Sequence, residues 1–319
     1  MRHLPYILIL FVLASCTKQE ATLSCDEARA LDSMALHIAV MPVMDCLPVY
    51  YAHRAGILDE VGLDARVHSY TATMDVDTAF TGGHAQIAYC DLIRALRLRQ
   101  DTPLSAFMQT QGRFSLVTLK SKRVSKVRQM KERMIAITRL SAVDYWCDAL
   151  IDSTKELAQE DVYRPQINDV RLRSEMLRTG LLEAAILPEP YATWMREVGN
   201  RELFDSSRDT MLLGTWIFRA DSTFTQERAQ QAKLFVEAYN KAVDGLNQHL
   251  LPDTVKAILC QTYGLPPALA DTLQLDSFCH ATLPKQGDVK IAAAWLRGRN
   301  RLPRDAQPDS LIDKRILLP

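Results

Sequence analysis

Polar side chains that could bind a small molecule follow several short apolar segments of this 319-residue chain. Carboxylates accept hydrogen bonds or balance a cation, and hydroxyls both donate and accept, so this mixture suits reversible binding of a polar solute. The side chains lie at Asp91 and in the loops at 41–45, 71–73, 138–141 and 188–191. The candidate ligand-binding residues are Met44, Asp45, Thr71, Ala72, Thr73, Asp91, Thr138, Ser141, Glu189 and Tyr191.

Each candidate also has a purely structural interpretation. Asp45, Asp75 and Ser141 each stand where a helix N-cap would, and we expect Asp75 to be a cap only. Asp91 directly follows an apolar segment, so both capping and ligand contact are compatible with it. Glu189 lies between two prolines that hold its backbone rigid, which favours a functional role. Aromatic residues either stack on a planar ligand or pack in the core: Tyr89, Tyr191, Trp194 and Trp216 keep both options, whereas Trp146 and Trp295 are assigned to packing.

Known catalytic and cofactor-binding motifs are missing from the sequence. It contains no GxSxG, P-loop, GxGxxG or HExxH pattern, and its seven histidines show no metal-ligand spacing. Lys+Arg and Asp+Glu both number 38, so no net charge attracts nucleic acid. The basic segment 120–133 lacks interleaved aromatics and indicates a solvated face. We therefore expect a non-enzyme with no catalytic residue, no cofactor, no metal and no nucleic-acid partner.

Apolar segments alternate with amphipathic ones along most of the chain, which is typical of α/β folds with parallel strands. The pattern predicts strands at 36–40, 65–70, 86–90, 104–109, 114–119, 134–138, 168–172, 184–187 and 211–218. It predicts helices from Cys46 to a stop at Gly56, from Asp75 to Gly82, and at 92–99, 142–155, 174–179, 225–249, 254–264 and 288–297. Ligands collect beyond the carboxyl ends of parallel strands, where the candidate residues lie.

Two such α/β series, followed by a helical tail, predict two lobes. The length also exceeds what one ordinary core fills. We expect the chain to cross between lobes near 112–118 and 208–216. Lobe 1 would then comprise 35–114 and 215–319, and lobe 2 would comprise 115–214.

The first fifteen residues are typical of an export signal. A basic start at Arg2 and His3 precedes an apolar run too short to span a bilayer. The run ends in Leu-Ala-Ser-Cys16, which resembles the bacterial lipobox, so we expect a signal peptide at 1–15, lipidation of Cys16 and a tether at 16–34. Six cysteines remain, and Cys260 with Cys279 is the one pair considered for a disulfide, with separate thiols an equal alternative.

Several ordered segments resemble the periplasmic solute-binding proteins of ABC importers for sulfonates, taurine, nitrate and thiamine pyrimidine precursors. Ile38–Asp45, with Pro48, Gly56–Leu58 and Gly62–Asp64, resembles that family's opening strand, helix and turn. Residues 79–91 are similar to its A-L-x-x-G-x-x-D-x-A-x-x-D segment, with Gln86 in place of an Asp. Residues 187–193 resemble its x-P-E-P-Y-A-T stretch, and 289–296 and 309–313 its closing helices. The resemblance covers roughly 36–316.

This resemblance implies a two-lobed α/β fold of the type 2 periplasmic-binding kind, each lobe a mostly parallel sheet flanked by helices. It implies a monomer that traps a small molecule and delivers it to an ABC permease and its ATPase. The expected location is the periplasmic side of a bacterial membrane, inner or outer, through the N-terminal lipid. Alternatives are an enzyme of thiamine-pyrimidine or menaquinone precursor metabolism on the same fold, or a ligand-sensing surface lipoprotein.

The ligand class rests on the acidic candidates and on the loop after the first strand. Met44-Asp45-Cys46 lacks the Ser/Thr-rich loop of many sulfonate binders. Asp45, Asp91 and Glu189, with tyrosines and tryptophans nearby, slightly favour a heterocyclic ligand resembling a thiamine precursor.

Overall fold

The computed structural model describes residues 32–248 and 252–317. The chain divides into a unit of residues 1–34 and a unit of residues 35–319. In the first unit only residues 32–34 are described, and they are helical. The predicted signal peptide, Cys16, Cys25 and the predicted tether up to residue 31 therefore lie outside the described residues.

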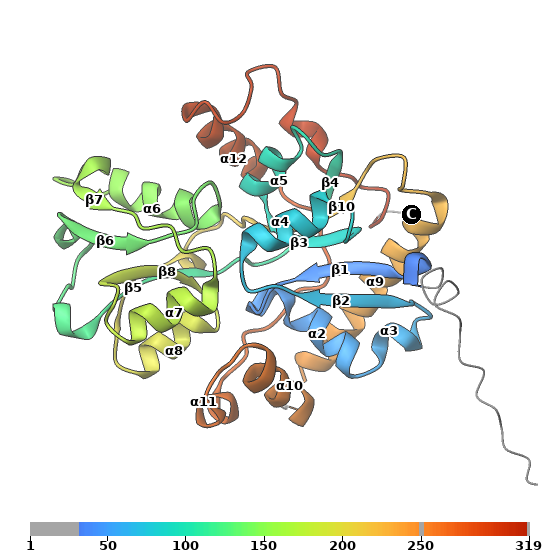
Figure 1. Cartoon of the computed structure of the whole chain (residues 1–319), viewed down its shortest axis with the longest axis horizontal. Coiled ribbons are helices and arrows are strands. Elements are labelled where there is room, and N and C mark those ends of the chain that lie inside the picture. The colour runs from blue at the N-terminus through green and yellow to red at the C-terminus, as the bar shows by residue number, and fades with distance from the viewer. Residues whose placement is uncertain (1–31, 249–251, 318–319) are drawn as a thin grey trace, which may run out of the picture. The chain divides into compact units, whose positions relative to one another are not determined.

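The second unit contains two five-stranded sheets, each with its own helices, which we call the first and second lobes (Figure 1). The first sheet has the strand order β2-β1-β3-β10-β4. Its strands are β1 (Leu36–Val40), β2 (Ala65–Ser69), β3 (Ile87–Asp91), β4 (Leu104–Gln109) and β10 (Gly214–Arg219). The second sheet has the order β7-β6-β8-β5-β9. Its strands are β5 (Phe114–Thr118), β6 (Arg133–Ala136), β7 (Val162–Tyr163), β8 (Ala184–Pro188) and β9 (Arg201–Asp205).

The two sheets share one topology. In the first, β1 pairs parallel with β2 and β3, whereas β10 pairs antiparallel with β3 and β4. In the second, β6 pairs parallel with β7 and β8, whereas β5 pairs antiparallel with β8 and β9. In each sheet one strand thus runs against the other four, because it is the strand with which the chain enters that sheet from the other lobe. The expected pair of mostly parallel α/β lobes is confirmed.

Helices complete both lobes. The first lobe contains α2 (Leu47–Arg54), α3 (Ile57–Glu60), α4 (Thr73–Thr81), α5 (Leu92–Leu98), α9 (Gln226–Leu246), α10 (Asp253–Ala257), α11 (Pro267–Thr272) and α12 (Gln286–Gly298). The second contains α6 (Ala142–Asp152), α7 (Val170–Arg178) and α8 (Tyr191–Glu197). Short 3₁₀ turns lie at Met44–Cys46, Lys120–Lys122, Val127–Met130, Gln159–Asp161, Ser206–Arg208 and Pro308–Leu311, and a π turn at Ile258–Thr262.

Local sequence accounts for several helix ends. Pro48 is tolerated in the first turn of α2, where its missing N–H would have no partner. The helix ends before Gly56, whose φ of 75° is the left-handed conformation that glycine adopts without strain. The carboxylate of Asp91 caps α5, and the hydroxyl of Ser141 caps α6, as predicted.

Three local predictions were wrong. Asp45 caps no helix, because its carboxylate is turned toward Tyr89 and Gly112. Asp75 lies within the first turn of α4 and makes no cap; Ala72 occupies the N-cap position. Residues 168–172 are not a strand: Asp169 caps α7 there, and the alternating Val-Arg-Leu-Arg sequence belongs to the first turn of that helix. The edge of the second sheet is instead formed by β7.

The chain crosses between the lobes twice, after β4 and before β10. Residues 110–113 form the first crossing and residues 209–213 the second. The crossings lie in contact: Gly112 has φ of 54°, and a Cβ there would lie 2.7 Å from the backbone nitrogen of Gly214. This close approach requires glycine at residue 112. The exact division of the chain at residues 114 and 214 remains a proposal.

The core of the first lobe is aromatic. Phe235 of α9 packs against Phe107 of β4 and Trp216 of β10, with ring centroids 6.2 and 5.2 Å apart. Trp216 is fully buried, so of its two predicted roles the structure shows the core role. The basic segment 120–133 forms mainly exposed 3₁₀ turns, in agreement with the predicted solvated face.

Candidate functional site

A cavity between the two lobes contains four of the candidate residues. This cavity, called here the inner cavity, has a volume of about 40 Å³ in the structure. The first lobe contributes residues from the carboxyl ends of β1 and β3 and from the starts of α4 and α5, including Thr73 and Asp91. The second contributes Phe114, Thr138, Ser141–Val143, Asn168, Val170, Arg173 and Pro188.

Hydrogen bonds between the lobes surround the inner cavity. The Met44 N–H donates to the carbonyl of Glu189 at 2.9 Å, and the Val170 N–H donates to the carbonyl of Thr71 at 3.0 Å. The Thr71 hydroxyl donates to Asp169 at 2.5 Å, and Ala72 forms an isolated β-bridge with Asp169. The lobes are therefore closed on each other, and residues 71–72 belong to the contact between them rather than to the cavity lining.

Arg173 is the residue of the inner cavity whose charge is least balanced. It lies on α7, is 2% exposed, and its guanidinium donates to Thr138 Oγ1 at 2.8 Å and to the carbonyl of Ile167 at 2.6 Å. Its Nε has no partner in the described chain, and no described carboxylate lies within ion-pairing distance of it. Burial lowers the pKa of Arg173 to about 10, although the Asp169 carboxylate at the start of the same helix opposes this. An unbalanced buried cation is costly, so this side chain suits a ligand with a negative charge.

Arg94, on the first-lobe side of the inner cavity, is fully balanced. Its guanidinium pairs with Asp77 and lies 3.8 Å from Asp91, and these carboxylates raise its pKa although burial opposes this. Asp91 accepts the Ile93 and Arg94 amides at 3.1 and 2.9 Å. Burial raises the pKa of Asp91, with Arg94 opposing. Asp91 is thus both a helix cap and part of the cavity wall, as its sequence position allowed.

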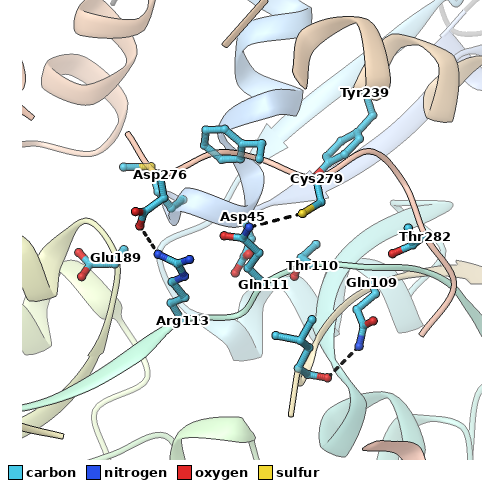
Figure 2. A pocket seen from close by; sticks show the side chains of 13 residues that line it. Asp45, Gln109, Thr110, Gln111, Arg113, Glu189, Tyr239, Asp276, Cys279 and Thr282 are labelled. Atoms are coloured by element: carbon cyan, nitrogen blue, oxygen red, sulfur yellow. Dashed lines mark hydrogen bonds and ion pairs between the residues drawn. The ribbon is translucent and has the colours of Figure 1, made fainter. Parts of the chain in front are cut away.

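A second cavity, the crossing cavity, lies beside the two chain crossings and encloses about 830 Å³ (Figure 2). Figure 2 shows Asp45 beside Thr110 and Gln111 of the first crossing, with Glu189 on the second-lobe side. Its walls are Met44, Asp45, Gln109, Thr110, Gln111, Arg113, Glu189, Leu212, Tyr239, Asp276, Phe278, Cys279 and Thr282. The Met44–Glu189 hydrogen bond joins the lobes at residues that line this cavity.

Asp45 links the first crossing to the first sheet. Its carboxylate accepts the Tyr89 hydroxyl at 2.7 Å and the Gly112 amide at 3.0 Å. Burial raises the pKa of Asp45, and the bonds from Gly112 and Tyr89 oppose this. The side chain therefore positions the crossing, and both of its oxygens are already used.

The raised pKa of Asp45 gives a stability prediction. Because the folded-state pKa lies above the ordinary value of 3.8, the contribution of Asp45 to stability is present in acid and is lost as pH rises through the folded pKa. We expect Asp45→Asn to lose no stability from this position as pH rises, because asparagine does not ionise. Its amide oxygen can still accept the hydrogen bond from the Gly112 amide. Urea unfolding of the wild type and of Asp45→Asn from about pH 4 to pH 8 measures how the free energy of unfolding of each depends on pH. Asp91 contributes equally in both proteins, so its effect cancels in the difference between the two curves. Parallel stability curves for the two proteins would contradict the prediction.

The remaining candidates are used within the protein. The Glu189 carboxylate accepts the Thr193 amide at 2.9 Å and pairs with Arg196 at 2.8 Å. Tyr191 is fully buried, and its hydroxyl donates to the carbonyl of Tyr263 at 3.0 Å. Neither side chain lies in the inner cavity.

Arg173, Arg94 and Asn168 were missed by sequence reasoning. Arg173 fell between a predicted strand and a predicted helix, so no face was assigned to it. The sequence feature that could have identified it is the helical spacing of the buried residues of α7, which are Val170, Arg173, Ser174 and Leu177. Arg94 carries the simpler signal of a cation three residues after the capping Asp91.

The described ranges also show how the cysteines and the possible metal ligands are arranged. No three His, Cys, Asp or Glu side chains of residues 32–248 and 252–317 converge as metal ligands would. The cysteines placed by the structure are all free thiols, including Cys260 and Cys279. Across the same ranges, no helix is both long and apolar enough for a bilayer crossing.

No known family model and no curated protein sequence matches this chain. Solved structures do match. The alkanesulfonate-binding protein SsuA of Xanthomonas axonopodis, bound to MOPS, is similar with a TM-score of 0.74 and 14% identity over 88% of this chain and 98% of that one. A conserved Candida albicans gene product with the generic periplasmic binding protein fold is similar with a TM-score of 0.63 and 12% identity, covering 88% and 97%.

The enzyme DszB, in complex with biphenyl-2-sulfinic acid, is also similar, with a TM-score of 0.62 and 16% identity over 89% and 97% of the two chains. Identities this low establish a shared fold and leave the activity open. The two sheets, the two crossings and these similarities together show that this chain has the two-lobed α/β fold of type 2 periplasmic binding proteins.

Proposed function

We propose that this chain is the solute-binding protein of an ABC importer, which closes its lobes on a small organic solute in the inner cavity. The observation that carries the proposal is the inner cavity itself, lined from both lobes at the carboxyl ends of their strands. A solute there contacts both lobes only when they are closed, so its binding favours the closed state. Recognition of that state by the permease would couple capture to transport.

For the ligand we propose a small molecule with an anionic group. The acidic residues behind the heterocycle preference are engaged internally: Asp45 by Tyr89 and Gly112, and Glu189 by Arg196. Arg173 instead offers an unbalanced cation, and Ala142 and Val143 at the start of α6 lie in the same cavity. A buried guanidinium beside a helix N-terminus favours a carboxylate, sulfonate or similar group.

Native mass spectrometry of the freshly purified protein tests solute binding directly. We expect a bound small molecule, and thermal stabilisation by members of a panel of alkanesulfonates, carboxylates and nitrate without their turnover. Stabilisation by a thiamine-pyrimidine analogue, with none by any anion, would overturn the anionic assignment in favour of the heterocycle. Turnover of a bound compound would overturn the binding-protein assignment.

An enzymatic function is the alternative that the similarity to DszB raises. Thiol catalysis needs a thiol with a lowered pKa. Burial instead raises the pKa of Cys46, and it raises the pKa of Cys90 and Cys147 to about 12. The raised pKa values therefore disfavour thiol catalysis by these three cysteines.

We further propose that Cys16 is lipidated, which would hold the protein on the periplasmic side of a bacterial membrane. The support is the Leu-Ala-Ser-Cys sequence after a short apolar run. Metabolic labelling with a fatty-acid analogue should mark the wild-type chain and not a Cys16→Ala variant. Equal labelling of the two would contradict lipidation at this cysteine.

A further inference from the structure

A third cavity, the outer cavity, opens directly beside the inner one. The two share Thr73, Arg94, Thr138 and Asn168 in their walls, so they are adjacent. The outer cavity is open to solvent, has a volume of about 590 Å³, and is lined by residues of both lobes. A solute that fills the inner cavity and is longer than it must therefore extend into the outer cavity.

The charge of the outer cavity is strongly positive. Asp77 is the one carboxylate in its wall. The five arginines that line it are Arg94, Arg97, Arg139, Arg299 and Arg301. Asp77 pairs with Arg94 and Arg97, and Arg299 pairs with Asp148. Within the described chain, Arg139 and Arg301 form no ion pair with a carboxylate.

The two uncompensated arginines come from different lobes. Arg139 lies in the loop between β6 and α6 of the second lobe, and Arg301 follows α12 of the first. Each adjoins a residue with left-handed backbone: Leu140 with φ of 53° and Asn300 with φ of 54°. At Leu140, a non-glycine residue, this conformation is strained, and the Asp144 carboxylate holds it by accepting the Leu140 amide at 2.9 Å. Closure thus places one exposed arginine from each lobe at the same cavity, where an anion between them would be attracted to both.

From this arrangement we infer that the outer cavity is a second anion subsite, and that the solute is a small organic dianion. One negative group binds at Arg173 in the inner cavity, and the other binds near Arg139 and Arg301 in the outer cavity. The inference rests on the proposed function, since it extends the same binding site. It adds that the second charge is recognised only by the closed protein, because each lobe supplies one of the two arginines.

Calorimetric titration with matched anions tests the inference. The probes are propanesulfonate against 3-sulfopropanoate and butanoate against succinate, which differ by one terminal carboxylate. We expect the dianion of each pair to bind at least about tenfold more tightly than the monoanion. In the double variant Arg139→Gln/Arg301→Gln this preference should disappear, while affinity for the monoanion and the melting temperature stay unchanged.

A matched control is the double variant Arg123→Gln/Arg128→Gln, which removes two exposed charges of the second lobe outside the three cavities. It should keep the preference for dianions. Equal affinity for monoanion and dianion in the wild type, or a preference that survives Arg139→Gln/Arg301→Gln, overturns the second subsite and leaves the proposed function standing. If none of the four anions binds, the anionic solute fails, and the second subsite fails with it.

Discussion

Replacing Arg173 with methionine is expected to weaken binding of the anionic solute by about thirtyfold or more, while the ligand-free protein stays folded. The affinity falls because a buried charge-assisted contact is lost, which costs about 2–5 kcal/mol. Stability changes little because two effects oppose each other. The bonds to Thr138 and Ile167 disappear, but so does the penalty of a buried cation.

The pKa of Arg173 gives the sign of that penalty. Burial holds this pKa at about 10, below its ordinary value of 12.5. The folded state therefore carries the cost of the charge at neutral pH and is relieved of it only as pH rises above about 10. Calorimetry and thermal unfolding of Arg173→Met measure the two effects. Arg178→Met, on an exposed position of the same helix, is the matched control and should bind normally. A large fall in melting temperature for Arg173→Met would mean that Arg173 is structural.

Replacing Asp148 with asparagine is expected to open the lobes and weaken binding of a monoanion by about ten- to a hundredfold. Asp148 lies on α6 of the second lobe, and its side chain is 3% exposed. It accepts the indole N–H of Trp295 on α12 of the first lobe at 2.7 Å and pairs with Arg299, whose guanidinium carbon lies 4.1 Å from the Trp295 ring centre. It also pairs with Arg164 of its own lobe at 2.6 Å.

These contacts stabilise the closed arrangement without touching the inner cavity, so their loss shifts the open–closed equilibrium for a monoanion bound there. A monoanion is the probe to use, because Arg299 lines the outer cavity. Small-angle scattering should show a larger radius of gyration for Asp148→Asn than for the wild type, and calorimetry should show the weaker affinity. Asp152→Asn, an exposed position on the same helix, is the control for losing a carboxylate. An unchanged radius together with unchanged affinity would show that closure does not depend on Asp148.

Short-range patterns predicted most of the elements of both lobes. The strand at 104–109 and the cap at Asp91 are where the sequence placed them, because a buried strand and a capping carboxylate are recognisable within a few residues. Residues 168–172 show the limit. Alternation over only five residues fits both an edge strand and the start of a helix, and the carboxylate of Asp169 decided for the helix by accepting the Leu172 amide.

Which residues line the site depends on contacts between distant parts of the chain, and sequence periodicity does not predict such contacts. Thr73, Asp91, Thr138 and Ser141 lie in one cavity because two sheets with the same topology face each other at their carboxyl ends. Glu189 was expected to bind the ligand, but α8 places Arg196 beside it, and the two side chains pair with each other.

The sequence by itself determined most of the strands and helices, the loops that follow the strands, and the absence of a familiar catalytic motif. The tertiary structure alone decided that Arg173 is buried without a balancing carboxylate, that Asp45 holds a chain crossing, and that Asp148 joins the lobes. The physical reason is the sequence distance over which each property is decided. A side chain's tendency to be buried depends on its near neighbours, whereas the balance of a buried charge depends on groups from distant parts of the chain that folding brings within a few ångströms.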